Sequence, residues 1–416
     1  MALTGAVCMV ALAAPGDLDP TFSGDGKLTT NFTRTHDGAN GVAIQANGKI
    51  VVAGQAGGYP ARSRFALARY RGGGTLDPTF GGDGKVTTRF AGSGFAADLA
   101  IQADGKIVVV GKANDKFALA RYNRNGTLDS TFNGDGKATT TFLPLDTAGA
   151  ASVAVQLDGK IVVAGSAWCE EKTLTCPAEE ESGEFAVARY DEDGTLDASF
   201  SEDGRVRTDI RGSDAASAVA LQADGKIVVA GGVGQGLSPN GEFGLARYQA
   251  DGTLDSTFGE GGKVTTNFAF SSGDNDAAYD LVIQANGKIV AAGRGAARFA
   301  LARYNADGTP DVTFSSDGKV TTSFTAQPEV AFGVAIQATG KIVAAGMAAG
   351  RFALARYNPG GTLDTTFGGD GKVRTNFTTG RDLAFDVALQ ANGKIILVGW
   401  AGGSDPRFAL ARYRGG

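Results

Sequence analysis

The sequence predicts an all-β fold: a seven-bladed β-propeller whose blades are four-stranded antiparallel sheets. Three observations lead to this prediction. One unit of about 57 residues recurs seven times along the 416 residues of the chain. Each unit has the pattern of four short strands separated by glycine-rich turns. The two ends of the chain carry complementary parts of one unit, as a closed ring requires.

The repeat is recognised by the motif Leu-Asp-x-Thr/Ser-Phe, which returns in every unit, with Pro310 in place of Leu once. A segment Gln-x-Asn/Asp-Gly-Lys-Ile, in which Thr339 replaces Asn/Asp once, and a segment Phe-x-Leu/Val-Ala-Arg-Tyr return equally often. Repetition this dense indicates a repeat architecture, so we expect residues 15–416 to form one propeller domain. The units begin near residues 16, 74, 126, 194, 252, 308 and 361.

In the first complete unit, strands are expected at residues 42–45, 49–54, 65–70 and 85–90. The first two flank Asn47-Gly48, and Asn-Gly is the preferred pair of a type I′ hairpin turn because both central residues need φ > 0. The other two are alternating or β-branched and are bounded by glycine-rich turns. No stretch keeps the 3.6-residue period of a capped helix, so little helix is expected.

The connector between the third and fourth strands indicates how the ring closes. In six units, the tyrosine that ends the third strand is followed 15 residues later by the Lys or Arg that opens the fourth. Only three residues follow the seventh tyrosine, Tyr413, but continuing in register from Gly416 to Gly16 brings in Lys27 at the fifteenth step. We therefore predict that residues 27–32 complete the last blade, beside the strands between 383 and 413. Such closure leaves no free sheet edge.

An arginine and an aspartate recur together in every unit. The arginine shares a strand face with Phe and Leu, where a charge needs a partner. We expect each arginine to pair with the aspartate of the Leu-Asp motif in a structural role; a ring of arginines that binds an anion is the alternative. The arginines are Arg69, Arg121, Arg189, Arg247, Arg303, Arg356 and Arg412. The aspartates are Asp19, Asp77, Asp129, Asp197, Asp255, Asp311 and Asp364.

A phenylalanine of the connector and a glutamine before the hairpin also recur seven times. The phenylalanines are expected to form the core between blades. The glutamines are expected to satisfy backbone groups at the hairpin. They are Phe22, Phe80, Phe132, Phe200, Phe258, Phe314 and Phe367, and Gln45, Gln102, Gln156, Gln222, Gln284, Gln337 and Gln390.

Composition limits the classes of partner. The net charge is −5 and there is no Lys/Arg block, so no footprint for nucleic acid or an anionic membrane is present. One His and three Cys exclude a repeated His or Cys metal site. GDGK segments such as residues 24–27 lack the alternating oxygen ligands and closing Glu of a calcium loop, and turn formation explains them. Neither a metal nor a cofactor is expected, and the propeller is expected to be monomeric.

The first 14 residues are apolar and small and end in Ala11-Leu12-Ala13, which suits signal peptidase. We interpret them as an export signal; an apolar N-terminus without that role is the alternative. The basic start of such a signal is missing, since the first Lys or Arg is Lys27. This fits a signal whose beginning lies upstream. The stretch is shorter than the ~20 residues of a membrane span, and no other apolar run reaches that length.

The cysteines support an oxidising compartment. Removal of the signal removes Cys8, whose surroundings lack the leucine typical of a lipid attachment site. It leaves Cys169 and Cys176 in one insertion, an even count that fits a loop disulfide. The chain is therefore expected to be secreted, periplasmic or on the cell surface.

Loop lengths indicate where a ligand would bind. In an antiparallel meander, the hairpin and the constant connector emerge at one end of the blade, and the two other connections emerge at the opposite end. The span from the second to the third strand varies from 5 to 19 residues. Loops on a rigid scaffold carry function, so this variable face, around the central opening, is the candidate binding surface.

Candidate ligand contacts on this face are aromatic and acidic residues, which suit glycan stacking or protein contact. The alternative is that these segments are solvated insertions without a ligand. The candidates are Tyr59, Trp168, Glu170, Glu171, Asp274, Asp276 and Trp400.

The pattern GTLDPTFGGDGKVTTRF, then VAIQANGKIVVAG, then FALARYN, resembles the delta-60 repeat of secreted and surface bacterial proteins. The resemblance covers essentially all of residues 16–416. Departures such as Arg205 for Lys and Ile210 for the Phe of strand four affect local geometry only. The resemblance implies a repeat-built extracellular protein of propeller type, and it supplies no catalytic residues.

Two functions remain open. The first is a non-catalytic binding or surface-interaction scaffold, which is hard to separate from a purely structural spacer. The second is a propeller hydrolase or lactonase with a metal or paired acids in an axial pocket. Asp98, Asp280 and Asp386 lie near the inner strand at equivalent places in three units, which favours structural use. The single histidine, His36, lies in a loop, and no catalytic constellation is evident, so an enzyme is not expected.

Overall fold

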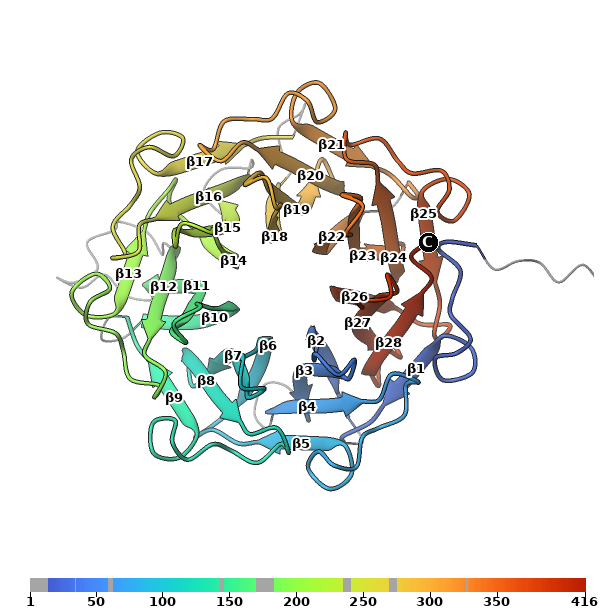
Figure 1. Cartoon of the computed structure of the whole chain (residues 1–416), viewed down its shortest axis with the longest axis horizontal. Helices are drawn as coiled ribbons and strands as arrows, with labels where there is room; N and C mark the ends of the chain where they lie inside the picture. Colours follow the sequence, from blue (N-terminus) through green and yellow to red (C-terminus); the bar gives the residue numbers. More distant parts are fainter. Residues whose placement is uncertain are drawn as a thin grey trace, which may run out of the picture.

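The computed structural model describes residues 14–33, 35–58, 63–142, 146–169, 183–234, 241–268, 275–326 and 328–416. These residues form 28 strands in seven four-stranded antiparallel sheets, which surround a central axis as the blades of a propeller (Figure 1). The predicted fold class is confirmed. No helix long and apolar enough to cross a membrane occurs among the described residues.

Within each blade the strands follow one another outward from the axis, and we number the blades in chain order. Blade one is β2 (Gly38–Ile44), β3 (Ile50–Ala56), β4 (Arg64–Tyr70) and β5 (Lys85–Thr88). Blade two is β6 (Gly94–Ile101), β7 (Ile107–Ala113), β8 (Lys116–Tyr122) and β9 (Lys137–Thr140). Blade three is β10 (Asp146–Val155), β11 (Ile161–Cys169), β12 (Gly183–Tyr190) and β13 (Arg205–Thr208). Blade four is β14 (Ala215–Leu221), β15 (Ile227–Val233), β16 (Glu242–Tyr248) and β17 (Lys263–Thr266).

The remaining blades follow the same plan except at the closure. Blade five is β18 (Ala277–Ile283), β19 (Ile289–Gly295), β20 (Arg298–Tyr304) and β21 (Lys319–Thr322). Blade six is β22 (Glu329–Ile336), β23 (Ile342–Ala348), β24 (Arg351–Tyr357) and β25 (Lys372–Thr375). Blade seven is β26 (Asp382–Leu389), β27 (Ile395–Ala401), β28 (Arg407–Tyr413) and, as its outer strand, β1 (Lys27–Thr30).

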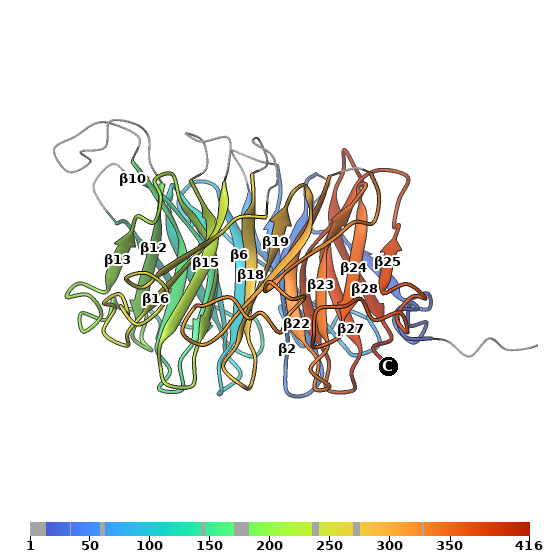
Figure 2. The same cartoon turned by 90° about the horizontal axis from the view of Figure 1, so that it is seen from above.

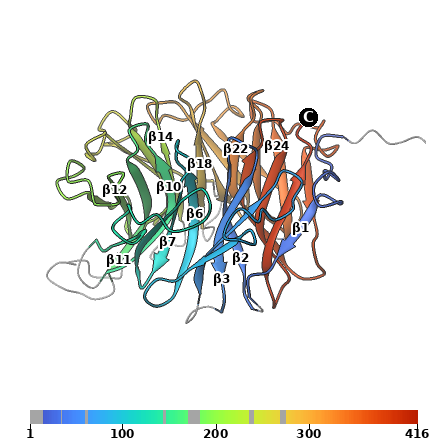
Figure 3. The ribbon, with the colours of Figure 1, turned by 60° about the horizontal axis from the view of Figure 1, so that its bottom comes forward.

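The first and last segments of the chain share blade seven. β1 pairs antiparallel with β28, from Lys27 opposite Ala411 to Thr30 opposite Phe408, and Figure 3 shows β1 beside the last blade. The connector before β1 adds the bridge between Leu18 and Tyr413. The predicted closure by residues 27–32 is confirmed, with the ladder itself ending at Thr30.

Strand bounds differ from the expected ones by one to four residues at several ends, and two of these differences have a clear structural cause. In blade one the inner strand begins at Gly38 instead of residue 42, because its first residues continue the ladder beyond a bulge that the sequence pattern does not reveal. The outer strand ends at Thr30 in blade seven because the next N–H groups leave the ladder. Those of Phe32 and Thr33 donate to the buried carboxylate of Asp37 instead.

The two ends of the blades form two different rims (Figure 2). The constant rim carries the hairpins, such as the one closed by Gln45 N–H to Lys49 O, together with the connectors between the third and fourth strands. The variable rim carries the connections from the second to the third strand and from the fourth strand to the next blade. Between β7 and β8 only residues 114–115 intervene, but between β3 and β4 residues 57–63 do. The inner strands run from the variable rim to the constant rim.

At the constant rim every repeated arginine contacts the repeated aspartate, with Nε to Oδ2 distances of 2.6–2.8 Å. The lysine of the hairpin completes the node, and its Nζ lies 2.6–3.1 Å from the same Oδ2. Sequence analysis did not identify this lysine as a partner. Each guanidinium also lies 4.5–4.8 Å from the ring centroid of the connector phenylalanine. It further donates to a carbonyl of the next blade, as Arg69 does to that of Arg124.

Apolar side chains and one hydroxyl bond hold neighbouring blades together. Each core cluster draws on two adjacent blades; Phe65 of blade one and Tyr122 of blade two, for example, lie in the same cluster. The tyrosine that ends each third strand donates to a threonine on the outer strand of the preceding blade, at 2.7–2.8 Å. The connector phenylalanines are fully buried, as expected.

The glutamines before the hairpin behave differently from the expectation. Their backbone groups close the hairpin, but in five of the seven units the side-chain amide oxygen accepts no hydrogen bond among the described residues. Instead, the Oε1 of Gln222 lies 3.5 Å from Nη1 of Arg247. In blade four the glutamine side chain therefore lies beside the arginine node. The amide oxygens that are buried without a hydrogen bond among the described residues are those of Gln45, Gln102, Gln156, Gln284 and Gln390.

Candidate functional site

Each inner strand carries a β-bulge at the same place of the repeat, two or three residues from its start at the variable rim in six blades and five residues from it in the longer β10. The extra residue lies between two residues that both pair with the second strand, as Asn40 does between Ala39 and Gly41. A β-bulge re-aims a side chain, and here the extra residues all line the central opening. They are Asn40, Ala97, Ala151, Ser217, Tyr279, Phe332 and Phe385.

A glycine on the second strand makes room for each bulge. A Cβ atom at Gly346, for example, would lie 2.0 Å from the carbonyl oxygen of Val330 and 2.9 Å from Cα of Ala331 on the inner strand. Only glycine fits this approach, and all seven second strands have one at this position. The glycine of the KIVVAG pattern is therefore what shapes the axial wall.

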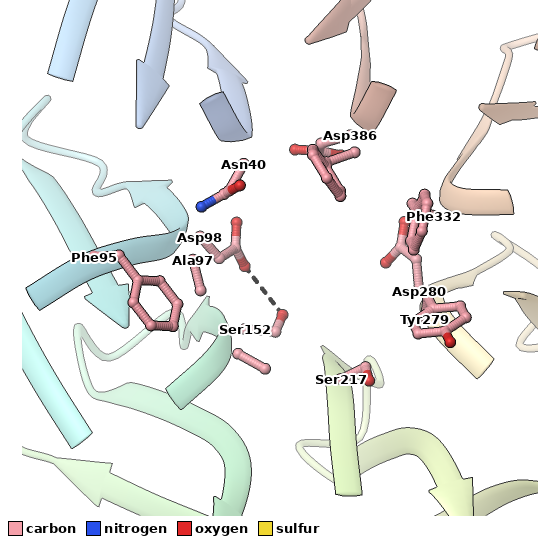
Figure 4. Close-up of a pocket in the computed structure, with 12 residues that line it drawn as sticks. Asn40, Phe95, Ala97, Asp98, Ser152, Ser217, Tyr279, Asp280, Phe332 and Asp386 are labelled. Atoms are coloured by element: carbon pink, nitrogen blue, oxygen red, sulfur yellow. Dashed lines mark hydrogen bonds between the residues drawn. The ribbon is translucent and has the colours of Figure 1, made fainter. Parts of the chain in front are cut away.

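The bulges enclose an axial pocket of about 290 Å³, which Figure 4 shows. Besides the seven bulge residues, its lining includes the next residue of four inner strands and Phe95 near the start of β6. Those four residues are Asp98, Ser152, Asp280 and Asp386. Because the bulges lie near the beginnings of the inner strands, the pocket lies toward the variable rim.

The pocket breaks the sevenfold repetition of the rest of the molecule. Blades five, six and seven present Tyr279, Phe332 and Phe385, which form a continuous aromatic arc with ring centroids 5.0 and 5.2 Å apart. Blades one to four present Asn, Ala, Ala and Ser at the same position. At the bulge positions, one side of the pocket is therefore a wall of aromatic rings and the other side is small or polar; Phe95 of β6 adds one ring to that second side.

Three aspartates of the pocket bridge neighbouring blades. Asp98 accepts the N–H of Leu99 on its own strand at 2.7 Å and that of Val153 on the next blade at 2.9 Å. Asp280 and Asp386 do the same, and their cross-blade donors are the N–H groups of Val334 and Val42, both at 2.7 Å. These acids thus have a structural role, because they bond neighbouring blades to each other. Their side chains also line the pocket.

The electrostatics of these carboxyls are unusual. Burial and the charge of Asp98 raise the pKa of Asp280 to about 7, although two backbone N–H groups favour its ionised form. Burial, together with the charges of Asp280 and Asp98, raises the pKa of Asp386 well above its ordinary value. Burial also raises the pKa of Asp98. The pocket therefore holds protons near neutral pH that ordinary aspartates have lost.

The described residues contain no group of three or more His, Cys, Asp or Glu side chains arranged to hold a metal ion. At the constant rim, a GDGK segment forms a turn in which Asp25 Oδ1 accepts the N–H of Lys27 at 2.9 Å. This is the role that the sequence indicates for such segments.

Several candidate contacts from the sequence lie outside the described residues: Tyr59, Glu170, Glu171, Asp274 and, for the disulfide, Cys176. Cys169 ends β11, but the predicted pairing of the two cysteines is not described. Trp168 on β11 and Trp400 on β27 are half-buried, and Trp400 lies against Gly38 of the next blade. Neither tryptophan lines the axial pocket.

Asp276, a candidate contact from the sequence, has its carboxylate committed to backbone groups. The residue is fully buried, and its carboxylate accepts the N–H groups of Phe268 at 2.7 Å and Ala296 at 2.9 Å. Asp37 and Asp214 hold the same kind of loop contacts in their blades. An acid before the inner strand thus serves the backbone, because the strand crossing at this rim leaves N–H groups that need an acceptor.

Sequence reasoning missed Asn40, Phe95, Tyr279, Phe332 and Phe385 as site residues. The signal was present, since one position of an otherwise uniform inner strand is aromatic in three consecutive units. Without knowledge of the bulge, period-two alternation does not place that position at the axis.

Comparison with solved structures shows likeness of fold. A catalytically inactive variant of virginiamycin B lyase from Staphylococcus aureus, solved with quinupristin, is 11% identical with a TM-score of 0.52, over 92% of this chain and 98% of that one. A Lactobacillus plantarum protein is 13% identical with a TM-score of 0.49, over 86% of this chain and 94% of that one. The polysaccharide lyase Uly1 is 12% identical with a TM-score of 0.49, over 90% of this chain and 89% of that one.

Sequence comparison gives a more specific result. No significant match is found among the curated proteins. A family profile, in contrast, matches a segment in every blade, and these segments make up just over half of the chain. They are residues 45–80, 102–132, 179–200, 222–258, 284–314, 337–367 and 390–415. The chain therefore belongs to the family described as "Domain of unknown function (DUF5122) beta-propeller".

Proposed function

We propose that this chain is a ligand-binding propeller, which takes a small organic ligand into its axial pocket through the variable rim. One observation carries the proposal: the aromatic arc of Tyr279, Phe332 and Phe385 interrupts a sevenfold pattern that the rest of the fold keeps closely. Structural closure needs no such asymmetry, since blades one to four manage with small residues. Concave pockets lined by aromatic rings and a few polar groups are typical of small-molecule sites.

The site of action is the second part of the proposal. We infer that the chain works outside the cytoplasm, as a secreted, periplasmic or cell-surface protein. The apolar residues 1–14, the Cys169/Cys176 pair and the resemblance to delta-60 repeats support this inference. Fractionation of the native host, with mass spectrometry of the non-reduced peptide that spans both cysteines, tests it. Cytoplasmic protein with two free thiols would contradict it.

Binding is tested by thermal shift against a panel of sugars, amines, aromatic acids and alcohols. A ligand of the pocket raises the melting temperature of the parent protein. Phe332→Ala removes the middle ring of the arc, and Ala151→Phe fills the small wall, so both variants should lose the shift. Leu157→Ala, at a fully exposed side chain, is the control and should keep it. A shift that survives both pocket variants would place the ligand elsewhere.

A second candidate function is a hydrolase or lactonase that uses the axial acids. The raised pKa of Asp280, about 7, favours it, because a carboxyl that titrates near neutral pH suits general acid or base catalysis. The backbone contacts on both of its oxygens weigh against it. Turnover of aryl esters, aryl glycosides or a sugar lactone by the parent, lost in Asp280→Asn, would favour the enzyme. Binding without turnover would favour the scaffold.

A further inference from the structure

We propose that the ligand of the axial pocket is an organic cation, a primary ammonium group carried on an apolar or aromatic body. The proposal rests on the proposed function and adds the chemical class of the ligand. It is argued from the unused hydrogen-bonding capacity of the small wall, the three carboxyls and the aromatic arc.

The small wall offers more acceptors than free donors. Asn40 Nδ2 donates one of its two hydrogens to the carbonyl of Ala96 at 2.7 Å, which leaves its second N–H and both lone pairs of Oδ1 for a ligand. The hydroxyl of Ser152 donates to Asp98 Oδ2 at 3.0 Å, so its lone pairs are what it offers a ligand. The hydroxyl of Ser217 can take either role. A ligand at this wall therefore meets mainly acceptors.

Each axial carboxyl that has lost its proton adds acceptors and negative charge, and for Asp280, with a pKa of about 7, this happens near neutral pH. A carboxylate has about four lone-pair sites, and the backbone contacts of Asp98, Asp280 and Asp386 occupy only part of them. Two cations lie nearby. The charge of Arg294 interacts electrostatically with Tyr279, and Nζ of Lys112 lies 2.8 Å from Oδ1 of Asp115. Neither lines the pocket, so a cation from solution would not meet a resident positive charge there.

The aromatic arc favours the same ligand from the other side. The faces of aromatic rings carry negative quadrupole charge and attract ammonium groups, while their area covers apolar groups. A pocket of about 290 Å³ is much larger than an ammonium ion, so the charged group must bring an apolar body with it. An anion would meet acceptors on one wall and ring faces on the other.

Benzylammonium is a suitable probe because benzyl alcohol and benzoate are its neutral and anionic counterparts of similar shape. Calorimetric titration of the parent protein should show benzylammonium binding at least about tenfold more tightly than benzyl alcohol, and benzoate not binding. Its affinity should rise from about pH 6 to about pH 8, because Asp280, whose pKa is about 7, loses its proton over that interval and benzylammonium keeps its own. Binding should release protons, seen as heats that depend on the buffer.

Two variants separate charge from shape. Asp280→Asn should weaken benzylammonium about tenfold and leave benzyl alcohol unchanged, whereas Phe332→Ala should weaken both. If Asp280→Asn does not fold, the pH dependence and proton release of the parent protein decide the matter. Equal affinity for benzylammonium and benzyl alcohol, no change with pH, or no benzylammonium binding up to about 10 mM would overturn the inference. Binding of a neutral sugar in the pocket, without binding of benzylammonium, would overturn the inference of a cationic ligand but would still support the proposed function. If no ligand of the panel binds, both the inference and the proposed function are wrong.

Discussion

Asp386, on the last blade, accepts the backbone N–H of Val42, on the first blade, at 2.7 Å through its Oδ2 atom, across 344 positions of sequence. The equivalent bonds from Asp98 and Asp280 join blade two to blade three and blade five to blade six. Carboxylates thus link three blade boundaries at the axis. Nodes of Arg, Lys and Asp recur in every blade at the constant rim. Substitutions of the axial carboxylates and substitutions of the nodes at the constant rim are therefore expected to have different effects.

At the constant rim, Asp77→Asn should lower the free energy of unfolding by about 3 kcal/mol or more. The change leaves the guanidinium of Arg69, which is 4% exposed, buried without its carboxylate. Urea unfolding followed by fluorescence measures the loss. Asp83→Asn is the matched control, because Asp83 is exposed and pairs with Lys85 at 3.6 Å at the surface, where a loss below about 1 kcal/mol is expected. Equal effects of the two changes would contradict the structural role of the node.

Phe22→Ala should cost about 4 kcal/mol, because it empties a fully buried position that packs the first connector against the last blade. Its ring lies 4.7 Å from the guanidinium carbon of Arg412, so the change also loosens the closure. Chemical denaturation provides the value. Leu157→Ala, at a fully exposed side chain, should stay within about 0.5 kcal/mol. A small effect at Phe22 would mean that the first segment contributes little to closure.

Stability should fall steeply in acid through the seven rim aspartates. Burial opposes their ionisation, but hydrogen bonds from Lys106 and Thr131 and the charge of Arg121 hold the pKa of Asp129 at about 2. A depressed pKa contributes stability above the unfolded value of about 3.9, which is lost as the pH falls through the folded value. Melting temperatures from about pH 6 to about pH 2 measure the effect. Asp129→Asn should show a flatter curve than the parent; parallel curves would refute the assignment.

The axial acids should make stability depend on pH in the opposite direction from the rim aspartates. The raised pKa of Asp280, about 7, means that its protonated form stabilises the fold. That contribution is complete below the unfolded value of about 3.9 and is lost as the pH rises toward 7. The free energy of unfolding of the parent should therefore drop, relative to that of Asp280→Asn, between about pH 4 and about pH 7. A constant difference across this interval would show that Asp280 titrates normally.

Gly346→Ala should destabilise the fold by about 2 kcal/mol and abolish ligand binding. A methyl group there collides with the carbonyl of Val330 and pushes the bulge of Phe332 out of the arc. Thermal unfolding and the ligand-induced shift are the measurements. Gly360→Ala, where no heavy atom lies within 4 Å of the added Cβ, serves as control. If Gly346→Ala still binds the ligand, the bulge is not needed for the binding site.

Much of the ring could be predicted from residue patterns because local signals agree with the global fold. The Asn-Gly hairpins, the constant 15-residue connector and the pairing of Arg with Asp depend on short-range chemistry that repetition makes visible. Lys27 could be placed beside the last blade by counting alone.

The site was less accessible to sequence reasoning. Phe332 lies on the axial wall because a bulge turns it there, and that bulge exists because Gly346 on the partner strand admits a close carbonyl. A bulge that depends on a residue of the neighbouring strand breaks the alternation of inward and outward side chains, so the pattern along one strand does not reveal it. Asp276 was expected to contact a ligand because acids in long loops usually face water; instead, backbone N–H groups without ladder partners draw it inside.

The seam in blade seven determines how the ring responds to tension. Since β1 and β28 are antiparallel, Lys27 at the start of one lies opposite Ala411 near the end of the other. A pull on both ends of the chain therefore loads first the bridge between Leu18 and Tyr413 and then one end of a four-residue ladder, whose bonds open one after another instead of shearing together. A molecule tethered by its first residues and dragged by its last would peel at this outer strand while the other six blades kept their form.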